Sequence, residues 1–322
     1  MSHFSDQSRG NYRNYYLRRR AGHTDLAPDR DERLDLLLKD DHAKDLFQGK
    51  VVLDVGCNSG AVSQEIAQLH QAKQVIGVDI DVDLIQQCGR TVQQAFSLQK
   101  PSISQAEFPA ERSRKKRKLL NGDRAGQAEE PISEGQLHYF PACFPALYGS
   151  LPIAGTSQAA ISEVHGAAQE AEGGRKRSKG SENSSEAPAQ KFPRNLVFYA
   201  ANWAEEEIET DANRYDVVLA LSLTKWIHLH GLDEGLIKFF QKCFDCIEPG
   251  GKLVLEKQGW RGYKDAKRST QTLKDNYFKL KLRPEEDFER ILLNEIGFAR
   301  REAVKNGSSS GFDRSLEIYY KA

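Results

Sequence analysis

The segment 51–60, with the sequence VVLDVGCNSG, constrains the fold more than any other part of the chain. A short apolar run of this kind is typical of a buried parallel strand. Gly56 and Gly60 follow it, and glycines let the backbone turn sharply and approach a ligand closely. A helical pattern begins at Ala61, so the turn also directs a helix N-terminus, with its partial positive charge, toward that ligand.

A second apolar run, QVIGVDID at 74–81, follows about twenty residues later. A strand, a glycine turn, a helix and a second strand that ends in Asp79 together form a nucleoside-binding unit. The carboxylate of Asp79 suits the two hydroxyls of a ribose. The alternative for Asp79 is an N-cap for the next helix.

The spacing of the glycines indicates which nucleoside ligand fits. A dinucleotide site has the pattern G-x-G-x-x-G, whereas this turn reads Asp54-x-Gly56-x-x-x-Gly60, with one glycine fewer and an added acid. An acid is badly placed for a diphosphate and well placed for a cation. The pattern resembles the first motif of class I S-adenosylmethionine-dependent methyltransferases, whose cofactor carries a sulfonium and an amino group. The alternatives are an ordinary strand-to-helix turn and, for Asp54, a role in stabilising the turn alone.

Composition narrows the class of protein. The 322 residues include 46 Lys plus Arg and 46 Asp plus Glu, so a nucleic-acid site has to be a local patch. Five cysteines without framework spacing favour a reducing compartment. The chain has no apolar run near the ~20 residues of a membrane span, and its polar, Arg-rich start does not resemble a secretory signal. We therefore expect a soluble intracellular protein that binds no membrane.

The chain divides into three zones. Residues 1–47 form a basic and aromatic extension with a helix expected from Asp31 to Phe47. Residues 48–322 form the methyltransferase domain, interrupted at 99–190 by a low-complexity insert. This insert has too few apolar side chains to offset its ordering entropy, so it is predicted to be disordered. The basic run 114–118 is interpreted as a nuclear localisation signal or an RNA-attracting patch, or otherwise as a solvated charge run.

Strands and helices alternate again after the insert. Strands are predicted at 195–202, 215–222, 252–256, 298–304 and 316–320, and helices at 232–247 and 284–295. This alternation predicts an α/β fold: a Rossmann-like, doubly wound, seven-stranded class I methyltransferase sheet with an antiparallel edge hairpin. Cys243 and Cys246 have metal or redox spacing, but inside a helix they are expected to be buried apolar residues.

Several segments together carry a more specific resemblance. They are GNYRNYY at 10–16, DERL at 31–34, LDVGCN at 53–58, LSLTKWIH at 221–228, DEG at 233–235, PGGKLVLE at 249–256 and GFDR at 311–314. Over nearly all of the chain outside the insert, this set resembles the RNA methylphosphate capping enzymes, relatives of the bicoid-interacting protein. Members of that family transfer a methyl group from S-adenosylmethionine to a 5′ phosphate of a small RNA.

The resemblance implies a set of cofactor contacts. By position these are Tyr16, Arg33, Gly56, Cys57, Asn58, Asp79, Ile80, Asn202, Trp203 and Leu221, with Asp54 added from the turn chemistry. The chain departs from the family at Leu17-Arg18, where Gly-Tyr is usual, at Trp203, where Tyr is common, and in 256–260, which lacks a usual proline. Without the resemblance, Arg33 would be interpreted as paired with Asp31 and Glu32 on a solvated helix face.

A second set of residues is predicted to contact RNA. Lys225 and Trp226 follow the fourth strand, at the sheet edge where ligands bind in α/β proteins, and Lys225 is the predicted catalytic residue. The alternative is a surface lysine beside a core tryptophan. Tyrosines interleaved with arginines near the N-terminus suit RNA ends, or otherwise form a tail that only raises solubility. The predicted RNA contacts are Tyr12, Tyr15, Arg18, Arg19, Lys225, Trp226, His228, Trp260 and Arg314. His228 and His230 are too few to predict a metal site.

The sequence thus predicts an RNA 5′-phosphate O-methyltransferase that uses S-adenosylmethionine to methylate the terminal γ-phosphate of a small noncoding RNA. The expected compartment is the nucleus, with the cytoplasm as the alternative, and no DNA partner is expected. The family resemblance also implies a La-related protein as a partner in a ribonucleoprotein. The alternatives are a methyltransferase for another RNA position and a non-catalytic RNA-binding scaffold.

Overall fold

The computed structural model describes residues 15–16, 30–39, 45–99, 139–141, 143–153, 190–206, 211–304 and 315–322. The predicted RNA contacts Tyr12, Arg18, Arg19 and Arg314 lie outside these residues, as do the basic run 114–118 and most of the insert. Within the described part of the chain, no helix is both long enough and apolar enough to cross a membrane.

The core is a seven-stranded sheet with the strand order β3-β2-β1-β4-β5-β7-β6. Its strands are β1 (Val51–Val55), β2 (Gln74–Asp79), β3 (Leu196–Ala200), β4 (Tyr215–Leu221), β5 (Ile247–Glu256), β6 (Arg300–Val304) and β7 (Leu316–Tyr320). The first five strands are parallel, and β7 runs antiparallel to both β5 and β6. This confirms the predicted doubly wound sheet with an antiparallel edge.

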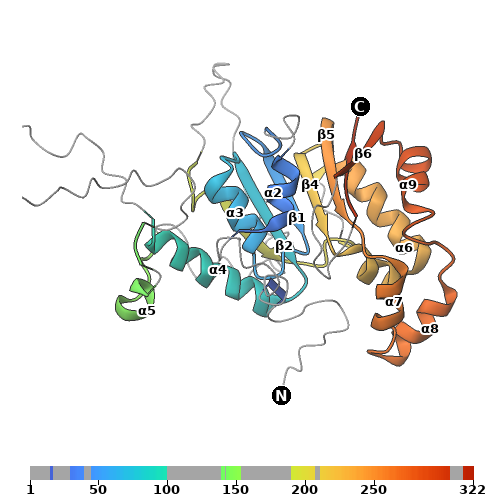
Figure 1. The fold of residues 1–322 in the computed structure, drawn as a ribbon, viewed down its shortest axis with the longest axis horizontal. Coiled ribbons are helices and arrows are strands. Elements are labelled where there is room, and N and C mark those ends of the chain that lie inside the picture. Colours follow the sequence, from blue (N-terminus) through green and yellow to red (C-terminus); the bar gives the residue numbers. More distant parts are fainter. Residues whose placement is uncertain are drawn as a thin grey trace, which may run out of the picture.

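Helices cover both faces of the sheet (Figure 1). On one face, α2 (Glu32–Leu38), α3 (Ala61–Leu69) and part of α4 (Val82–Ser97) pack on inward residues such as Val52 and Val217. On the other face, α6 (Thr224–Cys246), α9 (Phe288–Arg290) and the π-helical segment η4 (Ile291–Ile296) pack on Leu53 and Val218. Successive strand residues thus serve opposite faces, as the pleat requires.

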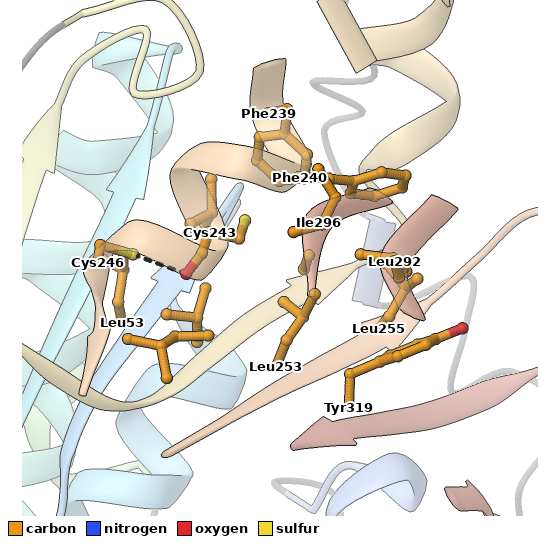
Figure 2. Packing of buried hydrophobic residues seen from close by; sticks show 14 of the residues in the cluster. Leu53, Phe239, Phe240, Cys243, Cys246, Leu253, Leu255, Leu292, Ile296 and Tyr319 are labelled. Atoms are coloured by element: carbon orange, nitrogen blue, oxygen red, sulfur yellow. Dashed lines mark hydrogen bonds between the residues drawn. The ribbon is translucent and has the colours of Figure 1, made fainter. Parts of the chain in front are cut away.

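The α6 face is the more aromatic of the two cores. Phe239, Phe240 and Cys243 of α6 lie against Leu253 and Leu255 of β5 in one buried cluster (Figure 2). Burial raises the pKa of the Cys243 thiol well above its ordinary value and that of Cys246 to about 12. Both cysteines are therefore neutral, buried side chains, which confirms their predicted apolar role.

Several predicted boundaries were wrong. The helix predicted from Asp31 to Phe47 ends at Leu38 in α2, and residues 45–49 form a turn. The helix predicted at 232–247 begins earlier, at Thr224, and is interrupted at Leu232, whose φ is 58°. Pro249 and the glycines after it do follow the end of α6 at Cys246, as predicted, but strand β5 already starts at Ile247 and includes them.

Three short helices were not predicted. α7 (Trp260–Ala266) and α8 (Gln271–Lys279) follow β5, where the sequence has few apolar residues at helical spacing. α5 (Phe144–Tyr148) lies inside the segment predicted to be disordered, and none of its side chains is buried. The helix predicted at 284–295 is reduced to α9 and the π-helical turn η4.

Candidate active site

A cavity of about 1050 Å³ lies where β1, β2, β3 and β4 end. Its lining combines the residues that follow each of these strands with two tyrosines from the N-terminal extension. The predicted site residues that line it are Tyr15, Tyr16, Asp54, Gly56, Asn58, Asp79, Ile80, Asn202, Trp203, Leu221, Lys225 and Trp226. Four strand ends, those of β1 and β2 before the insert and those of β3 and β4 after it, therefore converge on a single site.

The turn after β1 is shaped by left-handed backbone. Gly56, Asn58 and Gly60 have φ angles of 73°, 52° and 77°, a region that side chains other than glycine or asparagine rarely adopt. A Cβ on Gly60 would lie 2.7 Å from Cζ of Phe198, so glycine is required there for space as well as for conformation. The turn thus brings backbone close to the cavity without side-chain obstruction.

Asp54 is buried in the floor of the cavity. Its carboxylate accepts a hydrogen bond of 2.6 Å from the hydroxyl of Ser63, which ties β1 to α3. Burial raises the pKa of Asp54 to about 6, and the hydrogen bond from Ser63 opposes that rise. Among the described residues, no lysine or arginine is hydrogen-bonded to this carboxylate. A buried acid of this kind suits a cationic ligand, as the turn pattern predicts.

Asp79 organises the same turn from the end of β2. Its two carboxylate oxygens accept hydrogen bonds from the backbone N–H of Asn58 at 2.8 Å and of Asp81 at 3.0 Å. The N-cap of α4 is Asp81, which bonds the N–H groups of Asp83 and Leu84, so Asp79 is not the helix cap. Each oxygen of Asp79 keeps acceptor capacity at the cavity wall.

Arg33 lies behind the cavity rather than on its surface. Its guanidinium donates to both carboxylate oxygens of Asp31 at 2.8 Å and to Glu256 at 2.9 Å. The alternative interpretation was right that Arg33 pairs with Asp31. It was wrong that the pair lies on a solvated helix face, because only 2% of Arg33 is exposed. Glu256 also accepts a hydrogen bond from Ser222, whose hydroxyl receives one from Tyr15 at 3.1 Å.

Cys57 also lies behind the cavity wall. Its side chain is buried in a small cluster with Ile85 and Cys88. Direct cofactor contacts of Arg33 and Cys57 stay predictions.

The turn after β3 is held from two sides. The indole N–H of Trp203 donates to Asp211 at 2.9 Å, and the ammonium of Lys242 lies 4.2 Å from the Trp203 ring. Lys242 also donates to the backbone carbonyls of Trp203 and Glu206. Sequence reasoning missed Lys242, because its partners come from a turn that precedes it by about 40 residues and no motif marks the pair.

Lys225 lies at the start of α6, just after β4. Its ammonium is 4.5 Å from the ring centroid of Trp226, and its backbone N–H donates to the side chain of Gln258 at 3.3 Å. Lys225 is 9% exposed and lines the same cavity as Asp79. The lysine therefore faces a shared space with the nucleoside-binding residues, rather than lying on the open surface as the alternative held.

His228 and Trp260, two of the predicted RNA contacts, do not line the cavity. His228 is fully buried, with Nε2 at 2.7 Å from Asp233 and Nδ1 at 3.2 Å from the hydroxyl of Tyr263. Trp260 stacks on Tyr263 and Tyr277, at ring distances of 4.9 and 4.8 Å. These placements favour a structural role and give no support to a direct RNA contact. Among the described residues, no group of three or more His, Cys, Asp or Glu side chains could hold a metal ion.

The strand order, the glycine turn and the acids Asp54 and Asp79 define the class of protein. A parallel sheet with an antiparallel β7 next to β5, a glycine-rich turn over Asp54 and a second acid, Asp79, at the end of β2 make this a class I methyltransferase fold. Residues 52–113 match the model of a general methyltransferase domain. The cofactor is S-adenosylmethionine: the buried acid of the turn suits its cationic groups, and the cavity has room for it.

Comparisons with known proteins identify the family within this class. Residues 215–321 match the family model described as Bicoid-interacting protein 3 (Bin3). The chain is 30% identical, over 97% of its length and 80% of the relative's, to a probable RNA methyltransferase of Arabidopsis thaliana. It therefore belongs to the family of the RNA methylphosphate capping enzymes.

Two further relatives carry more specific names. A 7SK snRNA methylphosphate capping enzyme of Mus musculus is 32% identical over 86% of this chain, and the chain spans 36% of that enzyme's length. A U6 snRNA methylphosphate capping enzyme of Drosophila melanogaster is 29% identical over 97% of this chain and 74% of its own length.

Proposed function

We propose that this protein is an RNA methyltransferase that methylates the terminal γ-phosphate at the 5′ end of a small noncoding RNA. The observation that carries the proposal is the position of Lys225, which shares one cavity with Asp54 and Asp79. A point cation beside a nucleoside-cofactor site suits a phosphate acceptor. The names of the mouse and fly relatives, both snRNA methylphosphate capping enzymes, support the same acceptor.

The proposed methyl transfer needs no strong acid or base catalyst from the protein. Bound S-adenosylmethionine supplies an activated methyl group on its sulfonium. A terminal phosphate oxygen is already anionic near neutral pH, so no general base is needed to create the nucleophile. The residues of the cavity have to hold the acceptor oxygen in line with the methyl group and exclude water.

The named residues divide this work. Asp79 and the turn 56–60 hold the adenosine half of the cofactor, and Asp54 faces its cationic half. Lys225 neutralises part of the phosphate charge while one oxygen stays free to attack, and Trp226 forms the adjoining wall. Tyr15 and Tyr16 close the cavity from the N-terminal side. We place the protein in the nucleus, where its proposed substrates would be snRNAs, and a La-related protein remains the proposed partner.

A methyl-transfer assay tests the proposal with two variants and three RNAs. The RNAs share one sequence and end in a 5′ triphosphate, a 5′ monophosphate or a 5′ hydroxyl. We expect transfer of tritiated methyl to the triphosphate RNA, less or none to the monophosphate and none to the hydroxyl. Lys225→Ala should lower the rate by roughly 10²-fold, the size of effect seen when one charge-stabilising group is removed, with unchanged affinity for S-adenosylhomocysteine. Asp79→Ala should instead mainly weaken the binding of S-adenosylhomocysteine.

Other outcomes identify the alternatives. Equal methylation of all three RNAs would show that the acceptor is a base or a ribose rather than a phosphate. Tight binding of the triphosphate RNA with no methyl transfer, by protein that still binds S-adenosylhomocysteine, would favour the scaffold role.

A further inference from the structure

The two helices that follow β5 form a rigid unit beside the cavity. α7 and α8 pack on the first half of α6 through Trp226, Leu229, Tyr263, Leu273 and Tyr277 (Figure 1). The side chain of Asn276 donates to the backbone carbonyl of Leu229 at 2.9 Å. Because polar and apolar contacts both anchor it, the surface of this unit is held in a fixed position relative to the cavity.

The contact between the buried His228 and the partly exposed Asp233 strengthens that anchor. His228 contacts Tyr263 of α7, and the carboxylate of Asp233 accepts hydrogen bonds from the backbone N–H groups of Lys281 and Leu282, just beyond α8. One buried histidine and one carboxylate thus tie both ends of the α7–α8 unit to α6.

The outer surface of this unit is strongly basic. Its exposed cations are Arg261, Lys264, Arg268, Lys274, Lys279 and Lys281, against the acids Asp265 and Asp275 and Glu285, whose carboxylate accepts a hydrogen bond from the backbone N–H of Trp260 at the start of α7. Within the described residues, one ion pair joins members of this set: Arg268 and Asp265, both exposed, lie 3.6 Å apart. The whole chain has a formal net charge of zero, so this concentration of positive charge is local. A local basic patch is the electrostatic footprint of a polyanion site.

The same surface also exposes an aromatic ring. Phe278 is 68% exposed, although a phenyl group on a monomer surface is usually covered. The ammonium of Lys267 lies 4.6 Å from the Phe278 ring and 4.1 Å from that of Tyr277. Single-stranded RNA is bound by surfaces on which cations contact the phosphates and an aromatic ring stacks on a base. An acidic protein partner would use the charges without needing the ring.

Helix α7 lies close to Lys225 in the cavity. A Cβ on Gly262 of α7 would lie 4.0 Å from the ammonium nitrogen of Lys225. Arg261 and Lys264 flank that glycine on α7. A strand whose 5′ end reaches Lys225 would therefore leave the cavity next to α7.

We propose that the exposed surface of α7 and α8 binds the RNA that follows the 5′ terminal nucleotide, through phosphate contacts of its lysines and arginines and base stacking on Phe278. This inference rests on the proposed function, since it assumes an RNA 5′ end at Lys225. The surface would determine affinity for the RNA body, whereas the cavity would determine the chemistry at its end.

Binding and transfer measurements with matched variants test the surface. The test variant is Lys264→Ala/Arg268→Ala/Lys274→Ala, and a second is Phe278→Ala. The charge control is Lys73→Ala/Lys191→Ala/Arg194→Ala, three exposed cations at the opposite, amino ends of β2 and β3. Tyr148→Ala, on α5 and 79% exposed, is the control for Phe278. The probes are a 5′-triphosphorylated RNA of roughly 20 nucleotides, longer than one single-strand site, and a 5′-triphosphorylated dinucleotide.

The expected result is specific to the longer RNA. By fluorescence anisotropy at about 0.1 M salt, the test triple variant should lose roughly 10- to 100-fold in affinity for the long RNA, and the dependence of its affinity on salt should weaken. Phe278→Ala should lose several-fold by loss of stacking, on the order of one base–aromatic contact. Methyl transfer to the dinucleotide and affinity for S-adenosylhomocysteine should stay at wild-type values, and both controls should behave as wild type throughout.

The other possible results separate a failure of this inference from a failure of the proposed function. Wild-type affinity of the test triple variant for the long RNA, or equal losses in the test and control triples, would overturn the inference and leave the proposed function standing. If the wild-type protein methylates neither RNA, the proposed function fails. The anisotropy comparison would still show whether α7 and α8 bind RNA.

Discussion

Arg33 and Glu256 form a buried ion pair of 2.9 Å between residues 223 positions apart in the sequence. Each is at most 2% exposed, and Asp31 holds the other edge of the guanidinium. The pair joins α2, which precedes the methyltransferase domain, to the carboxyl end of β5. The helix that precedes the methyltransferase unit is therefore fixed to the sheet edge that carries the site.

Removing one partner of this pair should be strongly destabilising. Arg33→Met leaves two buried carboxylates without their cation, and we expect it to cost about 3–5 kcal/mol in the free energy of unfolding. Glu256→Gln keeps a hydrogen-bonding group in place and should cost less. Urea denaturation monitored by circular dichroism measures both. Lys238→Met, which breaks the exposed pair with Glu234, is the control and should change stability far less than Arg33→Met does. Equal losses in Arg33→Met and Lys238→Met would contradict a buried, stabilising pair.

The part of the fold that the sequence predicts well is the part specified by local pattern. The strand 51–55, its glycine turn, the next helix and the strand ending in Asp79 are encoded within about thirty residues, the size of one βαβ unit. The sharp turn at Gly56 and Gly60 and the place of Asp79 at the end of its strand follow from residue type and spacing. The antiparallel edge was also predicted, because each of its strands has its own alternation.

The contacts that were missed are those made by distant residues. No local pattern pairs Arg33 with Glu256, or Lys242 with the carbonyls after Trp203, since both depend on how the helices pack on the sheet. α7 was missed because its apolar residues contact α6 rather than forming a stripe of their own. His228 was predicted to contact RNA, and its burial against Tyr263 appears only once α7 is in place.

Gly60 offers a test of the turn. Gly60→Ala would force a left-handed φ of 77° on an alanine and place its Cβ within 3 Å of Phe198 and Cys88. Gly49→Ala has the same backbone problem, with a φ of 69°, but no atom within 4 Å of the new methyl group. We expect Gly49→Ala to cost about 1–2 kcal/mol and Gly60→Ala about 1–3 kcal/mol more, because only the latter overpacks. Thermal unfolding compares them, and calorimetry should show weakened S-adenosylhomocysteine binding for Gly60→Ala alone. Similar losses for the two variants would show that the turn is not tightly packed.

Asp54 makes cofactor binding dependent on pH. Its pKa of about 6 lies above the ordinary 3.8, so the folded protein without ligand holds the proton more tightly than the unfolded chain does. That contribution to stability is present below about pH 4 and is lost as the pH rises through 6. A cationic ligand prefers the ionised carboxylate, so affinity for S-adenosylhomocysteine, through its amino group, should fall by up to about tenfold per unit below pH 6.

The control for this pH dependence is Asp54→Asn. The amide cannot titrate, so the variant should bind more weakly at pH 7 and show a shallower loss of affinity between pH 7 and pH 5. A residual slope is expected from Asp79, whose pKa burial also raises. Calorimetric titrations at four pH values measure both proteins. A variant with the full wild-type slope would show that Asp54 does not face the cofactor's charge.

His228 couples proton uptake to the anchoring of α7 and α8. Burial lowers its pKa from 6.5, although the hydrogen bond to Asp233 opposes the shift. The neutral ring satisfies both neighbours if Nε2–H donates to Asp233 and Nδ1 accepts from the hydroxyl of Tyr263. Because the unfolded chain takes up a proton at higher pH than the folded one, this histidine's contribution to stability should fall as the pH drops below about 6.5.

His228→Asn should reveal that contribution. We expect lower stability than wild type at pH 7.5, because Asp233 and Tyr263 lose a well-placed partner, and a smaller difference from wild type at pH 5.5. Urea denaturation midpoints at the two pH values measure this, and hydrogen exchange should be faster in α7 and α8 of the variant. His230→Asn, at an exposed histidine of the same helix, is the control and should follow the wild-type pH dependence. If the gap between wild type and His228→Asn stayed constant from pH 7.5 to 5.5, the buried ring would not be the group that titrates. Unchanged exchange in α7 and α8 would show that the anchor of the basic surface lies elsewhere.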